Sequence, residues 1–544
     1  MAAGDVSPPL ATPAGTVDDV SPSLQRESSP DPTQPEVMLE HLQLQEQRQL
    51  AVSAVSAMEC TCPSFVRAVP AWAVLRSFGQ VLRGTNMNAN ELYSMSFQVD
   101  SIDEFWSHSW HSIVFLKVWL LLMLKNGRAA CVGGTMIATL VAYLSYADVL
   151  PGWYKEPRLQ GPGYSGEFRF SPWANLSGCA SALLLLLFWQ SSSKVFLDRT
   201  CIHQGDGRLK AEGIINLGAL LKKSRTLVVV WDPSYLSRLW CVFELAAFIH
   251  GHREDPSSSL KKHLVIKPSV LVPLTFLVGA NSALTLLFET ALPDTDVVAF
   301  MRIVLFAGSQ FPLIYIIQRL WRKVMDAEKQ FRNFSMQKVK CYCCSVNHLD
   351  QAGKPMPCDK EIIADCIVEW YGSVEDFEVG VRTHVHDAFI EQVSRFPLGY
   401  QWTVGMTTCI LWGQLDAIAA RAHGGAYSYA ASVVVVTMAW FLWVTPTHFL
   451  IMIRIIAYLM ETCQSKSLLF SSLATCVGYI VIGVFTFLPH ALQALLYQAF
   501  PEPLVGAGVF WGVTLCTAGV SHYFLARPWK GASGPGRTEP KASK

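Results

Sequence analysis

A carboxylate, an indole and a thiol stand close together in the segment Trp240-Cys241-Val242-Phe243-Glu244-Leu245. In a helix, residues four apart lie on one face, so Trp240 and Glu244 would project to the same side. A carboxylate in such a place can stabilise positive charge that develops in a transition state. Two structural alternatives stay open: Glu244 pairs with the nearby Arg238, and Trp240 is a core residue.

A second group of residues has the chemistry of metal ligands. Cys341, Cys343, His348 and Cys358 offer three thiols and an imidazole, which are preferred zinc ligands, and four of them could close a tetrahedral site. Their spacing differs from the paired CxxC pattern of zinc ribbons. Palmitoylated or simply reduced cysteines therefore remain alternatives to a zinc site.

The elements around Glu244 follow the order of an α/β domain. A hydrophobic run at residues 194–198 is followed by a polar loop, an amphipathic segment at 213–224 and a predicted strand at 226–231. A second loop leads into the helix of Glu244, and a further short strand is predicted at 263–267. This alternation predicts a parallel sheet covered by helices.

The same order resembles the TIR-domain family. In that family a strand ending in Asp, a Gly-bearing loop, a helix ending in Ser, a hydrophobic strand and a Trp-Cys-x-x-Glu-Leu helix follow one another. Residues 101–110, SIDEFWSHSW, are similar to the first strand of the family. The resemblance implies a flavodoxin-like parallel sheet whose domain is split into residues 101–127 and 191–267 by a transmembrane hairpin at 128–190.

The resemblance also implies an activity and a site. Many TIR domains cleave the bond between ribose and nicotinamide in NAD and need the Glu of this helix, which here is Glu244. His108, Trp110, Asp198 and Trp240 would then bind NAD, the substrate, at the carboxyl edge of the sheet. Other TIR domains only self-associate, and this chain departs from the family in its long loop at 200–213 and in the apparent loss of the final strands and helix.

Composition predicts an α-helical, multi-pass membrane region. Hydrophobic residues make up 51% of the chain and charged residues 16%, and the mean hydropathy is +0.29. We expect eight spans, in hairpins at 128–190 and 268–318 and in the C-terminal region 401–526, with residues 448–461 as an interfacial helix. The positive-inside rule predicts a cytosolic α/β domain and cytosolic termini. The formal net charge of +1 argues against a nucleic-acid partner.

The remaining segments complete the expected organisation. Residues 1–36 and 527–544 are predicted to be disordered tails, the latter basic, whereas 37–100 and 319–400 should be cytosolic helical segments, the second of them containing the cysteine group. The lipid bilayer and a second copy of the chain are the predicted partners. We expect a function in signalling or stress response through NAD cleavage. The alternatives are a non-catalytic adaptor, or a transporter or channel regulated by the TIR-like domain.

Overall fold

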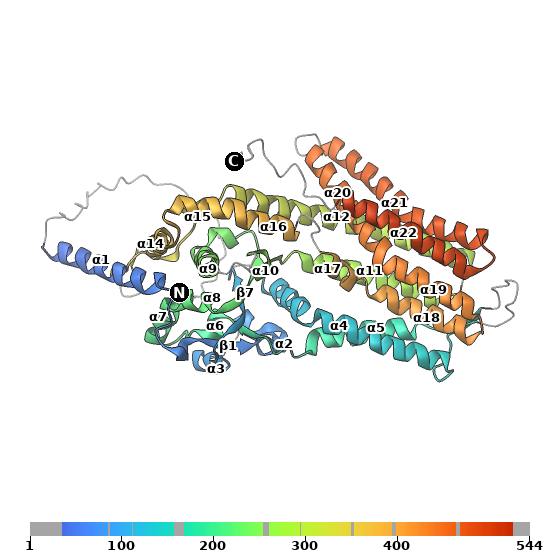
Figure 1. Cartoon of the computed structure of the whole chain (residues 1–544), viewed down its shortest axis with the longest axis horizontal. Helices are drawn as coiled ribbons and strands as arrows, with labels where there is room; N and C mark the ends of the chain where they lie inside the picture. The colour runs from blue at the N-terminus through green and yellow to red at the C-terminus, as the bar shows by residue number, and fades with distance from the viewer. Residues whose placement is uncertain are drawn as a thin grey trace, which may run out of the picture.

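The computed structural model describes residues 35–84, 87–110, 113–156, 168–253, 260–293, 295–349, 353–393, 399–463 and 468–525. The two tails predicted to be disordered lie outside these residues, except for the last two positions of the first tail. The molecule is elongated, with a mixed α/β part at one end and a bundle of long helices at the other (Figure 1).

A six-stranded sheet organises the α/β part, in the order β2-β1-β6-β3-β7-β8. Four neighbouring strands, β6, β3, β7 and β8, are parallel. If they are numbered by their order in the sequence, they lie across the sheet in the order 2-1-3-4. The two outermost strands on one side are antiparallel additions. The strands are β1 (Arg67–Pro70), β2 (Phe97–Gln98), β3 (Ile102–His108), β6 (Lys194–Phe196), β7 (Ser224–Trp231) and β8 (Leu264–Pro268).

The pairing of β3 with β6 confirms that residues far apart in sequence form one sheet. Glu104 stands opposite Val195 and Phe105 opposite Phe196, and the two phenyl rings stack with centroids 4.6 Å apart. Everything between the two strands is therefore an insertion into the sheet domain. This insertion consists of α4 (Val114–Tyr146), β4 (Tyr154–Glu156), β5 (Phe168–Phe170) and α5 (Trp173–Phe188).

Helix α4 joins the sheet domain to the helical bundle. We expected one helix to cover the sheet and a separate span to follow, but the structure has a single helix of 33 residues. Such a helix is about 50 Å long, well beyond the roughly 30 Å of a bilayer core. Its first turns bury Val118 and Leu121 in the core of the sheet domain, and the rest runs into the bundle (Figure 1).

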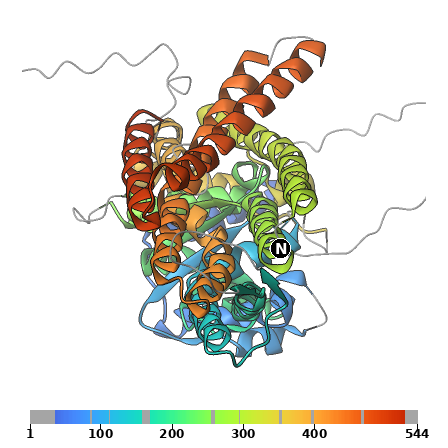
Figure 2. The same cartoon turned by 90° about the vertical axis from the view of Figure 1, so that its right-hand side faces the viewer.

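Among the residues that the structure describes, five helices are long and apolar enough to cross a bilayer: α4, α11 (Leu271–Ala291), the continuous helix Tyr427–Met460, Cys476–Ala499 within α21, and α22 (Pro503–Leu525). Residues 448–461, expected as a separate interfacial helix, instead continue α19 (Tyr427–Ala439) through a π-helical turn, η5 (Trp440–Val444), into α20 (Thr445–Cys463). Helix α21 (Leu468–Ala499) packs along α20, and one end of this pair projects from the bundle (Figures 1 and 2).

Shorter or more polar helices complete the bundle: α12 (Asp296–Arg332), α17 (Tyr400–Met406) and α18 (Cys409–His423). Helix α18 packs on α4 and α5, where Trp412 lies so close to Gly178 that a Cβ atom there would come within 2.6 Å of the indole. The hairpin predicted at 128–190 is thus bound to the C-terminal helices.

The cysteine-containing segment covers the sheet domain. Phe389 of α16 (His386–Val393) lies against Trp231 of β7, with ring centroids 5.9 Å apart. Gln392 accepts a hydrogen bond from Ile266 N and donates one to Leu264 O. Its side-chain amide therefore bonds to backbone groups on the outer edge of β8. The other elements here are α13 (Tyr342–Ser345), α14 (Asp359–Tyr371), α15 (Val374–Gly380) and η4 (Val381–Val385).

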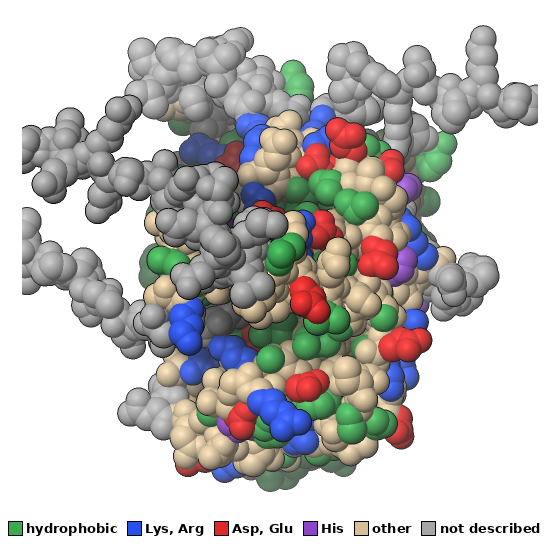
Figure 3. Space-filling view, turned by 90° about the vertical axis from the view of Figure 1, so that its left-hand side faces the viewer, with side chains coloured by type: hydrophobic (Ala, Val, Ile, Leu, Met, Phe, Trp, Pro, Cys, Tyr) green, Lys and Arg blue, Asp and Glu red, His purple; other side chains and the backbone are tan. Residues whose placement is uncertain are grey.

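The segment 37–100, expected to contain only helices and linkers, also supplies β1 and β2. Its helices are α1 (Pro35–Ser56), α2 (Ala71–Arg83) and α3 (Ala89–Ser94). The helices between the parallel strands are α6 (Asp198–Cys201), α7 (Gly207–Ile215), α8 (Leu217–Lys222), α9 (Leu239–Gly251) and α10 (Leu260–His263). Basic and acidic side chains are interspersed on the end of the molecule away from the bundle (Figure 3), as on a water-exposed surface.

Candidate functional site

The carboxyl ends of β3, β6 and β7 meet at one edge of the sheet. The chain passes from β3 to β6 on one side and reaches β7 on the other, so the strand order reverses at β3. Ligands of open α/β sheets bind outside the carboxyl ends of the strands at such a reversal. The site residues predicted from sequence after β3 and β6 fall at this edge.

Glu244 of α9 reaches the end of β3. Ser107 is fully buried there and donates a hydrogen bond to Glu244 Oε2. The Ser107 hydroxyl is also 2.6 Å from the hydroxyl of Tyr235, which is buried in the turn after β7. Glu244 is thus held by a network that joins β3, the turn after β7 and α9.

The surroundings of Glu244 favour its neutral form. Burial of the carboxyl group raises its pKa to about 8, the hydrogen bond from Ser107 opposes this shift, and the negative charge of Asp198 adds to it. The carboxyl is consequently protonated at neutral pH, and a cation entering the site would favour the carboxylate.

Asp198 and Trp110 are in direct contact. The indole Nε1 of Trp110 donates to Asp198 Oδ2 over 3.1 Å, and the Arg199 guanidinium lies over the indole, 5.7 Å from its centroid. Burial raises the pKa of Asp198, which hydrogen bonds from Arg199 N and Trp110 oppose. The structure therefore brings Trp110, Asp198 and Glu244 to the same edge, as predicted.

His108 is also at this edge, but it is buried. Its ring lies against Trp110 with centroids 4.7 Å apart, and the thiol of Cys241 contacts its carbonyl oxygen. Burial and, to a smaller extent, the positive charge of Lys117 lower the pKa of His108 to about 3, so the ring is neutral. Among the described residues, its Nε2 has no hydrogen-bond partner.

Trp240 is placed differently from the other predicted binding residues. Its ring makes an edge contact with Phe243, at 5.7 Å between centroids, and it packs against the main hydrophobic core. These contacts match the core alternative for this residue.

Two charged residues of the site were not predicted. Lys117, in the first turn of α4, is 2% exposed and donates to Ser109 O, and Asp232 and Asp198 are near enough to attract its ammonium group. Asp232 accepts hydrogen bonds from the backbone and hydroxyl of Ser234. A lysine within the apolar run 111–124 was the only signal of this cluster in the sequence.

Three of the four predicted metal ligands lie close together, and Cys344 joins them in place of the predicted Cys341. The ligand atoms of Cys343, Cys344, His348 and Cys358 all lie within 4.8 Å of one another. Cys341 forms a different group, with Cys343 and Asp359. Cys344 thus stands where the sequence analysis placed Cys341.

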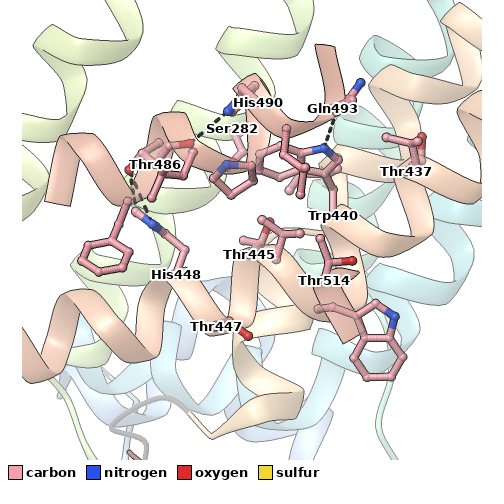
Figure 4. Close-up of a pocket in the computed structure, with 18 of the residues that line it drawn as sticks. Ser282, Thr437, Trp440, Thr445, Thr447, His448, Thr486, His490, Gln493 and Thr514 are labelled. Carbon is pink, nitrogen blue, oxygen red and sulfur yellow. Dashed lines mark hydrogen bonds between the residues drawn. The ribbon is translucent and has the colours of Figure 1, made fainter. Parts of the chain in front are cut away.

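A cavity of about 720 Å³ lies within the helical bundle (Figure 4). His448 and Thr486 face one another across 3.2 Å, His490 bonds to Thr486 O, and Trp440 donates to Gln493 over 2.8 Å. Most of the remaining wall is apolar, from α11, α19, α20, α21 and α22.

No protein family, curated protein or solved structure matches this chain.

Proposed function

We propose that this chain is a multi-pass membrane protein whose α/β domain is TIR-like and cleaves NAD in signalling or stress response. The observation that supports the proposal best is the position of Glu244. Glu244 lies partly buried at the reversal point of the sheet, where the negative charge of Asp198 acts on its carboxyl group, and Asp198 in turn accepts a hydrogen bond from the indole of Trp110. The parallel strand order, which is that of flavodoxin-like sheets, supports it as well.

The proposed reaction depends on the positive charge that develops on the substrate. When the bond between nicotinamide and ribose breaks, its electron pair leaves with nicotinamide, and positive charge develops on the ribose. Glu244, ionised beside the cationic substrate, would stabilise that charge or orient the ribose hydroxyls. Water then adds to the ribose carbon and loses a proton, which gives ADP-ribose and nicotinamide.

The test is NAD consumption by the purified full-length protein, compared with Glu244→Gln and with Glu375→Gln, an exposed glutamate of α15. We expect turnover by the parent protein and by Glu375→Gln, and a loss of about 100-fold or more in Glu244→Gln. Absence of turnover in all three proteins, with self-association intact, would favour the adaptor alternative instead.

The cavity in the bundle supports a second candidate, transport or binding of a small molecule among the spans. Among its polar lining residues are His448, His490 and Gln493. Flux through proteoliposomes that Gln493→Leu reduces would support this candidate, and flux no greater than in empty liposomes would contradict it.

A further inference from the structure

We propose that Cys343, Cys344, His348 and Cys358 bind a structural zinc ion. Three thiolates and one imidazole make a complete tetrahedral set for zinc, with no open position for substrate. The site is independent of the proposed NAD chemistry and would exist in an adaptor as well.

The sulfur positions fit a shared ion. In a tetrahedral site with zinc–sulfur bonds of about 2.3 Å, two sulfurs are about 3.8 Å apart. The Sγ atom of Cys358 lies 3.9 Å from that of Cys343 and 3.7 Å from that of Cys344. A disulfide would require about 2.05 Å, so these thiols are spaced for a metal rather than for a covalent bond.

The backbone is bent so that His348 joins the thiols. Asn347 and His348 have φ angles of 53° and 58°, in the left-handed region that non-glycine residues seldom adopt. This bend lets His348 N donate to Cys343 O over 2.8 Å, while His348 O accepts from Met356 N. Within the described part of the chain, the buried Nε2 of His348 has no hydrogen-bond partner, and a metal would supply one.

Neighbouring cysteines have other contacts. Cys341 Sγ is 3.0 Å from Cys343 Sγ but lies outside the group of four, and it forms a second group with Cys343 and Asp359. Cys366 is buried in α14 and its thiol points to Val52 O of α1. These contacts leave Cys344, rather than Cys341, as the third thiolate.

The position of the site gives it a structural role. Lys340, just before the cysteines, donates from its backbone to Ser237 O, and its carbonyl accepts from Leu239 N at the start of α9. Farther along the chain, the hydroxyl of Tyr371 in α14 donates a hydrogen bond to Ala246 O, which is also in α9. A metal that closes the turn between these two contacts would fix the segment against α9, the helix that positions Glu244.

The test is metal analysis of the full-length protein, purified in detergent with reductant and without chelator. We expect about one zinc per chain, and a loss of most of it in Cys358→Ser and His348→Ala. Cys341→Ser and Cys62→Ser are matched controls and should retain the metal. Iron or copper in place of zinc, or no metal after reconstitution with zinc, would overturn the proposal.

A second measurement avoids variants that fail to fold. In the parent protein, alkylation of Cys343, Cys344 and Cys358 should be slow with zinc present and at least about tenfold faster after a chelator is added, whereas Cys62 should react equally in both. Equal rates at the three cysteines with and without chelator would contradict the site. Because neither readout depends on NAD turnover, failure of the zinc site and failure of the NAD proposal are distinguishable.

Discussion

Two acids, one in each half of the molecule, have different environments. Asp416 in the bundle is 2% exposed, and its two oxygens accept hydrogen bonds from Ala174 N and Asn175 N, at 2.8 and 2.9 Å. These are first-turn amides of α5, which has no side-chain cap of its own. Glu244 in the sheet domain is bonded to a serine hydroxyl and has a second acid, Asp198, near it.

The difference indicates a structural role for Asp416 and a chemical role for Glu244. Both oxygens of Asp416 cap the N-terminus of α5, so this acid is unsuited to a transport path through the bundle. Glu244 has one hydroxyl donor and a second acid nearby, which leave the negative charge of its ionised form uncompensated. A cationic substrate would compensate it, which is why we assign the chemistry to the sheet edge.

The largest effect is expected for Asp416→Ala. The variant leaves two buried amides without acceptors and should lower the free energy of unfolding by about 3 kcal/mol, because each unsatisfied group costs about 1–3 kcal/mol. Unfolding of the detergent-solubilised protein would measure it. Asp416→Asn keeps one acceptor and should lose less, and an Ala variant as stable as the parent would show that α5 does not depend on this cap.

A smaller loss is expected for Ser107→Ala. The change removes the partner of both Glu244 and Tyr235, so stability should fall by about 2 kcal/mol. Ser237→Ala, which removes a partly exposed hydroxyl bonded only to the Ser234 carbonyl among the described residues, is the control and should lose about 0.5 kcal/mol. Equal losses in the two variants would mean that the network around Glu244 is no stronger than an ordinary surface hydrogen bond.

The smallest stability effect should depend on pH. Because the folded protein raises the pKa of Glu244 from 4.5 to about 8, the unfolded chain loses this proton first as pH rises, and stability falls between about pH 4.5 and 8. Glu244→Gln removes the titration. We expect it to match the parent near pH 4 and to be more stable than the parent above pH 8. The full shift would correspond to roughly 5 kcal/mol, but because the Glu244 side chain is partly exposed we expect a difference of about 2 kcal/mol, as thermal unfolding at several pH values would show. A constant difference across this range would contradict a buried, neutral Glu244.

The sequence was most informative where hydrophobic strands alternate with helices. The run before Trp231 and the motif at Glu244 were enough to predict β7 and α9, and their pairing with residues 101–110 followed from resemblance. Strand β1 was missed because it has only four residues and ends in Pro70, which is a weak strand signal.

Other differences between the prediction and the structure also have local causes. Residues 448–461 were predicted to be a separate interfacial helix because the run is too short to span a bilayer and carries Arg454, but in the structure they continue the helix before them through the π-helical turn at residues 440–444. The partners of Glu244 illustrate a different limit. Ser107 and Tyr235 are 128 positions apart, and no periodicity or spacing reports a contact that only the folded sheet creates.

The most direct test of the central claim is the pH dependence of NAD cleavage by the full-length protein and by Glu244→Gln. We predict that turnover at limiting NAD rises with a midpoint near pH 8, as Glu244 ionises, reaches its plateau roughly one pH unit higher, and is about 100-fold slower at the plateau in Glu244→Gln. NAD cleavage by Glu244→Gln at the parent rate, or none by the parent at any pH, would contradict the assignment of the chemistry to the sheet edge.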